Sequence, residues 1–172
     1  MRNLEYKARI DAPNALAAKA RALGFDLWGD LRQTDTYFAT PNGRLKLRET
    51  AGFQAELIFY ERDENGADRP SDYEVAHSHE PDALRNLLTG VLGVLGTVRK
   101  RRTLLVLDGT RVHLDNVEGL GTFMEIEVPV SESDLAARER MDWLLGELGL
   151  AWDGGIRASY LDLTLGATNT KT

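Results

Sequence analysis

The segment Arg2–Ile10, with the sequence RNLEYKARI, opens the chain and shows a pattern that several later segments repeat. Apolar and polar side chains alternate along it, which predicts a β-strand with two different faces. Leu4 and Tyr6 belong to the apolar face, whereas Glu5 and Lys7 belong to the charged face. A solvated strand has the same pattern, so this segment alone favours ordinary exposure of its charges.

Three later segments combine one apolar face with one charged face in the same way. Cations alternate in Arg44–Glu49 and in Val98–Leu107, whereas carboxylates alternate in Thr122–Val130. Because carboxylates and cations fall on different strands, faces that converge inside a barrel would form a site for a metal and a polyphosphate. The residues of these charged faces are Arg44, Lys46, Arg48, Lys100, Arg102, Glu125 and Glu127.

The composition is typical of a globular protein with one core. The chain has 172 residues, of which 42% are hydrophobic and 28% are charged. We expect a single domain over residues 1–166 and a disordered tail over 167–172. The net charge of −6 argues against nucleic acid as a partner. Neither a membrane span nor a signal peptide is recognisable, so we expect a cytoplasmic protein.

The chain contains no cysteine, which limits the chemistry available to it. Disulfides, cysteine-based zinc sites and a cysteine nucleophile are excluded. A metal would have to be bound by carboxylates or by histidines, and carboxylate oxygens suit Mg²⁺ or Mn²⁺. We expect His77 and His79 in a solvated turn rather than at a metal.

Helical and strand-like segments follow one another irregularly, which predicts the α+β class. Helices are expected at Ala15–Leu23, Pro81–Leu92 and Ser131–Leu148. Asp11 is the expected N-terminal cap of the first helix, and Ser131 is the expected cap of the third.

Turn signals indicate how the strands connect. Pro41-Asn42-Gly43 and Asp108-Gly109 predict tight hairpins, so the sheet should be mostly antiparallel. About eight strands are predicted, enough for a closed β-barrel, or tunnel, with a charged interior. Helices packed outside would cover its apolar outer faces. Trp28 and Leu31 are expected to be packing residues.

Six short sequence motifs match those of a known protein family: Asn3–Lys7, Leu47–Glu49, Lys100–Arg102, Arg111–Asp115, Glu118–Glu127 and Ser159-Tyr160. Together they resemble the CYTH superfamily, also called the triphosphate tunnel metalloenzymes, from Leu4 to about Leu163. The class IV adenylyl cyclase-like branch is the most similar. That family opens with Glu-x-Glu-x-Lys, and here Asn3 replaces the first glutamate.

The resemblance implies an antiparallel tunnel that binds a triphosphate together with Mg²⁺ or Mn²⁺. The metal ligands that it implies are Glu5, Asp115, Glu125 and Glu127. The catalytic cations that it implies are Lys7, Arg48, Lys100 and Arg102. Further substrate-binding candidates, several placed mainly by alternation, are Arg44, Lys46, Arg62, Arg111 and His113. Among these, Arg62 would replace a lysine that many members carry near the end of the fourth strand.

The phosphate-binding pattern leaves the reaction open, because the reaction depends on the nucleophile. A ribose 3′-hydroxyl would convert ATP into cyclic AMP and pyrophosphate, as class IV adenylate cyclases do. Water would instead hydrolyse thiamine triphosphate or tripolyphosphate. A non-catalytic module that binds a polyphosphate or a nucleotide is the third alternative, because Asn3 removes one carboxylate. The family also suggests a homodimer.

Overall fold

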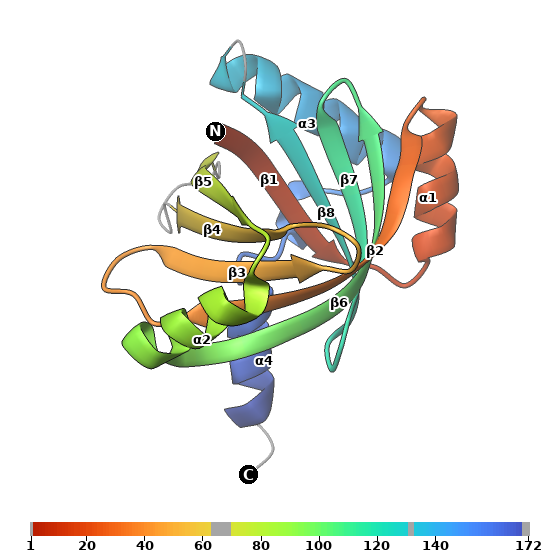
Figure 1. Ribbon diagram of the computed structural model, residues 1–172. Coiled ribbons are helices and arrows are strands. Elements are labelled where there is room, and N and C mark those ends of the chain that lie inside the picture. The colour runs from red at the N-terminus through yellow and green to blue at the C-terminus, as the bar shows by residue number, and fades with distance from the viewer. Residues whose placement is uncertain (1, 63–69, 131–132, 170–172) are drawn as a thin grey trace.

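The computed structural model describes residues 2–62, 70–130 and 133–169 (Figure 1). Within these residues, eight strands form one curled sheet in the order β1-β5-β4-β3-β2-β6-β7-β8, and every neighbouring pair is antiparallel. The α+β class and the antiparallel barrel predicted from the sequence are therefore confirmed. The strands are β1 (Arg2–Arg9), β2 (Asp26–Phe38), β3 (Arg44–Thr50), β4 (Ala55–Arg62), β5 (Pro70–Ser78), β6 (Val94–Leu107), β7 (Thr110–Val117) and β8 (Gly121–Pro129).

The barrel closes only along a short seam. β1 pairs with β8 from Asn3 to Arg9, but it pairs with β5 only from Arg2 to Leu4. Pro70 faces Leu4 at the end of this seam and has no N–H group to extend the ladder. The sheet is therefore close to a half-barrel, in which β1 and β5 meet only at one end (Figure 1).

Four α-helices accompany the sheet in the described residues: α1 (Pro13–Ala22), α2 (Pro81–Leu92), α3 (Asp134–Leu148) and α4 (Tyr160–Asn169). None of them is long and apolar enough to span a membrane. The helix α4 extends to Asn169, three residues past the domain boundary expected at residue 166.

The predicted helix caps were placed wrongly. The N-cap of α1 is Ala12 without a side-chain hydrogen bond, and Pro13 begins the helix in place of an Asp11 cap. At α3 the cap is Ser133, whose Oγ accepts a hydrogen bond from the Ala136 N–H at 3.1 Å. The predicted cap Ser131 lies outside the described residues.

The helices cover the outer, apolar faces of the strands. α1 and α3 pack on β1, β7 and β8, where Met141 and Leu144 contact a cluster that includes Ile126. α2 packs over Phe38 and Leu47 through its leucines. This arrangement confirms that the usual barrel pattern is inverted, because the apolar side chains point outward and the charged ones point inward.

The helix α4 closes one end of the barrel. In Figure 1 it lies at the lower end, beneath β6. Tyr160 and Leu161 pack there with inward-facing residues of the sheet, among them Val98 and Phe123. The interior therefore has an apolar floor at this end, on which the charged side chains of the middle of the barrel rest.

Trp28 is not the packing residue that the sequence predicted. Its side chain is 56% exposed, and its ring contacts Phe53, which is 57% exposed, at 5.7 Å between ring centres. The strand β2 begins at Asp26, and Trp28 lies where β2 pairs with Leu104 and Leu105 of β6. This is the opposite end of β6 from Val98, against which α4 packs.

The turn between β2 and β3 depends on a glycine. Gly43 has a φ of +62°, and an added Cβ would lie 2.7 Å from the Phe59 ring. We predict that Gly43→Ala lowers the free energy of unfolding by about 1–3 kcal/mol, because L-residues are strained there and the ring must move. Gly146→Ala is the control, because Gly146 is helical with open space around it. This change should stabilise the protein by about 0.5–1 kcal/mol.

Thermal unfolding checks this pair of variants. Each kcal/mol should shift Tm by about 2–4 °C in a domain of this size, so the two melting temperatures should move in opposite directions. A Tm of Gly43→Ala equal to that of the wild type would show that the turn is not constrained.

Candidate functional site

A cavity of about 660 Å³ occupies the polar interior of the barrel. Trp28 and Phe53 lie at its exposed end, and Arg48, Arg102 and Glu125 line its wall. The side chains that line it come from β1 to β8, because alternation on each strand turns every second residue inward. Charges that are far apart in the sequence therefore meet in one cavity.

Asp35 is the centre of a buried cluster of cations. Its carboxylate accepts two hydrogen bonds from Arg48, both at 2.8 Å, and one from Lys100 at 2.9 Å. The Nζ of Lys46 lies 3.4 Å away. Burial opposes ionisation, but Arg48, Lys100 and Lys46 together hold the pKa of Asp35 well below its ordinary value.

Asp35 is a site residue that was not predicted from the sequence. It lies on β2 directly opposite Arg48 of β3, within the sequence QTDTYFA. Its position between Gln33 and Tyr37 in the inward-facing set was the available signal. A single acid among neutral neighbours does not stand out without knowledge of the neighbouring strand.

Lys46 and Lys100 are buried close to other cations, and the single carboxylate of Asp35 does not neutralise all of this positive charge. Burial and Arg48 lower the pKa of Lys46 to about 7, even though Asp35 opposes this shift. Burial, Arg48 and Arg102 lower the pKa of Lys100 to about 8. A polyanion in the cavity would favour the charged form of both side chains.

Arg102 and Asp115 form a second buried pair. The guanidinium of Arg102 donates to the two Asp115 oxygens at 2.7 and 2.6 Å and to Glu125 at 2.9 Å. The Tyr160 hydroxyl donates to Asp115 Oδ2 at 2.9 Å. Asp115 is thus held by a cation and by α4, and the structure does not bring it into the acidic group described next.

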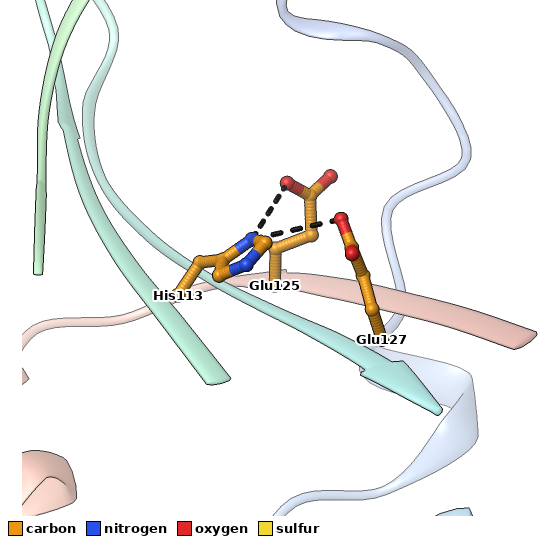
Figure 2. Close-up of side chains that lie close together, drawn as sticks. All are labelled: His113, Glu125 and Glu127. Atoms are coloured by element: carbon orange, nitrogen blue, oxygen red, sulfur yellow. Dashed lines mark ion pairs between the residues drawn. The ribbon is translucent and has the colours of Figure 1, made fainter. Parts of the chain in front are cut away.

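His113, Glu125 and Glu127 form a compact group of possible metal ligands (Figure 2). One donor atom from each residue lies within 4.8 Å of the others. Nδ1 of His113 is 3.7 Å from an oxygen of Glu125 and 3.7 Å from an oxygen of Glu127, too far for hydrogen bonds. Glu5 lines the same cavity and is the cross-strand neighbour of Glu127.

This group fits a divalent cation because one of its buried donor atoms has no partner. Nδ1 of His113 is buried and makes no hydrogen bond in the described structure. Burial and the nearby Arg102 lower the pKa of His113, which favours the neutral imidazole that binds metals. His113 was predicted as a substrate-binding residue and not as a metal ligand, because its nearness to the two glutamates depends on strand register.

The two glutamates are held in their ionised form. Burial opposes the charge of Glu125, but Lys7, His113 and Arg102 outweigh it and hold its pKa well below the ordinary value. The Nζ of Lys7 is 3.2 Å from Glu125 and 4.3 Å from the centre of the Tyr160 ring. The pKa of Glu127 is also lowered, against burial, by His113 and Arg111.

The remaining candidates from the sequence have different positions. Arg111 lines the cavity and donates to Glu127 at 2.8 Å. Arg44 donates to Asp162 of α4 at 2.8 and 3.0 Å and does not line this cavity. The side chain of Arg62 lies outside the described residues.

Asp35 allows the charge balance of the site to be tested. We predict that Asp35→Asn lowers the free energy of unfolding by about 3–5 kcal/mol, because three buried cations lose their shared carboxylate. Urea unfolding measures this loss. Added tripolyphosphate should restore stability to this variant more than to the wild type, since it supplies the missing negative charge.

Asp26→Asn is the matched control, because Asp26 lies on the same strand and is exposed. It should change the free energy of unfolding by less than about 0.5 kcal/mol. Equal stability of Asp35→Asn and Asp26→Asn would contradict the central position of Asp35 in the cation cluster.

Comparison with known proteins supports the family resemblance. A Methanocaldococcus jannaschii protein, whose name proposes an adenylate cyclase, is 27% identical over 175 residues, which cover 95% of this chain and 98% of the relative. The structure of the PH1012 protein from Pyrococcus horikoshii has a TM-score of 0.85 at 22% identity, with 94% of this chain and 98% of that chain covered.

A further solved structure shares the fold as well. A proposed adenylyl cyclase from Hippeastrum, described with a dominant triphosphatase activity, has a TM-score of 0.68 at 19% identity. The match covers 96% of each chain. A family model described as the CYTH domain matches residues 1–155, which is most of the sequence. The chain therefore belongs to the CYTH domain family.

Proposed function

We propose that this protein is an enzyme that binds a triphosphate and a divalent metal in the barrel cavity and cleaves the triphosphate. The observation that carries the proposal is that one cavity is lined both by the possible metal group and by three buried cations, Lys46, Arg48 and Arg102. Arg102 joins the two, because it contacts Asp115 beside the cations and Glu125 in the acidic group.

The cations suit the phosphate chain. Arg48 and Arg102 present planar guanidinium groups that bind phosphate oxygens with two hydrogen bonds at once. Lys46 and Lys100 add charge when an anion enters. Because these groups are buried and already in position, they can neutralise the charge that develops on phosphoryl oxygens without reorganising solvent.

The acidic group suits a metal. His113, Glu125 and Glu127, with Glu5 beside them, would hold it, and their carboxylate oxygens favour Mg²⁺ or Mn²⁺. Such an ion, when bound, would offset the negative charge of phosphate oxygens. Lys7 keeps Glu125 ionised, and Arg111 orients Glu127, so both residues support the ligand set.

Two reactions remain in competition. The name of the Methanocaldococcus relative and the class IV-like sequence motifs favour formation of cyclic AMP and pyrophosphate from ATP. The triphosphatase activity described for the Hippeastrum neighbour favours hydrolysis, for which the family resemblance implies thiamine triphosphate or tripolyphosphate as the substrate. Asp115 as a metal ligand, Arg44 as a substrate contact, a cytoplasmic location and a homodimer stay predictions.

Product analysis tests the proposal. Purified protein is incubated with ATP, thiamine triphosphate or tripolyphosphate, each with Mg²⁺, Mn²⁺ or a chelator, and the products are separated. We expect metal-dependent turnover of at least one of them, and cyclic AMP or orthophosphate identifies the reaction. Binding of a triphosphate without turnover would contradict the proposal of an enzyme and support the non-catalytic binding module.

Glu127→Gln is the variant that tests the metal group. Turnover should fall by more than about 100-fold, since even groups that only orient metal ligands are worth about 10–100-fold. Glu125→Gln is less suitable, because Glu125 also neutralises Lys7 and Arg102 and its loss would cost stability. Glu139→Gln, on the exposed face of α3, is the control and should retain full activity.

Binding should also depend on pH. The pKa values of Lys46 and Lys100 are lowered to about 7 and about 8 in the free protein, and a bound polyanion should raise both. Binding therefore takes up protons, and affinity should fall as pH rises from about 7 to 9. Calorimetric titration with tripolyphosphate at several pH values measures the change. In Lys46→Arg the fall should be smaller, and an equal fall in this variant would exclude Lys46 as a cause.

A further inference from the structure

Two exposed aromatic rings stand at the mouth of the charged cavity. Trp28 and Phe53 are each more than half exposed, and their ring planes meet at 34°. Both line the same cavity as Arg48, Arg102 and Glu125. Aromatic side chains of this size are usually well buried, so an exposed pair that lines a cavity with charged groups suggests a ligand surface.

A β-bulge turns Trp28 toward the cavity. The pairing of β2 with β6 shifts between Leu27 and Gly29, so Trp28 is an extra residue without a partner on β6. Further along β2 the cavity-lining residues are odd-numbered, namely Leu31 and Gln33. Without the bulge, Trp28 would lie on the outer face. Bulges that re-aim a side chain are frequent next to functional sites.

Phe53 is presented by the turn between β3 and β4. Its N–H donates to the Thr50 carbonyl at 3.0 Å, and Gly52 before it has a φ of +84° that suits glycine. The strand β3, which leads into this turn, carries Arg48 two residues before Thr50. The ring is therefore held at a fixed distance along the chain from the cation cluster.

Gln33 lies between the aromatic pair and the cations, and one of its polar atoms is free. Its side chain is 7% exposed, and its amide nitrogen donates to Thr50 Oγ1 at 3.2 Å. Its Oε1 is buried and makes no hydrogen bond in the described structure. A buried acceptor without a partner is costly, so a donor on a ligand in this cavity would satisfy it.

We infer that the cavity mouth binds the planar aromatic ring of an organic triphosphate, with the ring stacked on Trp28 and Phe53. Gln33 accepts a hydrogen bond from an N–H or O–H group between the ring and the phosphates. The inference rests on the proposed function and narrows its substrate class to triphosphate esters that carry an aromatic group. ATP and thiamine triphosphate both have this chemistry, and inorganic tripolyphosphate lacks it.

Equilibrium binding of ATP, thiamine triphosphate and tripolyphosphate to the whole protein, each with Mg²⁺, tests the inference. We expect Trp28→Ala to lower the affinity for at least one of the two aromatic ligands by about 10- to 100-fold, the range for loss of one stacking contact. Binding of tripolyphosphate should change by less than about twofold. Trp28→Phe should recover most of the affinity, because a ring remains. Whichever of ATP and thiamine triphosphate responds identifies the aromatic ligand.

Trp143→Ala is the matched control, because Trp143 is also exposed, at 40%, but lies on α3 and does not line the cavity. It should leave all three affinities unchanged, and thermal unfolding confirms that each variant is folded. Unchanged binding of both aromatic ligands to Trp28→Ala, or equal weakening of tripolyphosphate, would overturn the inference and leave the proposed function standing. Failure of the wild type to bind any triphosphate would overturn both.

Discussion

The mutual neutralisation of buried charges is the interaction on which this barrel depends. Isolated ions in a protein interior cost many kcal/mol, and they persist only when partners of opposite sign are close and well oriented. Asp35 meets Arg48 and Lys100, Asp115 meets Arg102, and Glu125 meets Lys7. Because each pair joins different strands, the same contacts that make the interior tolerable also fix how the strands are arranged around it.

The interior changes character along the barrel axis. At one end, α4 and the strand residues packed on it form an apolar floor. Buried cations and carboxylates lie in the middle, and Trp28 and Phe53 form an aromatic mouth at the other end. Tyr160 links the first two zones, because its ring lies against Lys7 and its hydroxyl bonds Asp115. A triphosphate ester has a matching order, with a compact polyanion at one end and an organic group at the other.

Much of the site could be predicted from the sequence because strands alternate strictly. The placement of Lys46, Arg48 and Glu127 on inner faces needed only this period of two. Alternation fails where register or irregularity decides. It could not show that Asp35 lies opposite Arg48, that His113 meets two glutamates, or that a bulge brings Trp28 to the cavity.

The sequence by itself determined the strand faces, the family and the kinds of charge available, since each follows from residue type and local spacing. The tertiary structure decided which charged and polar groups pair with one another and which remain available to a ligand. Asp115 is paired with Arg102 and Tyr160, whereas His113 Nδ1 and Gln33 Oε1 have no partner in the described structure. Those outcomes depend on the register between neighbouring strands and on the packing of α4, and the alternation along a single strand records neither.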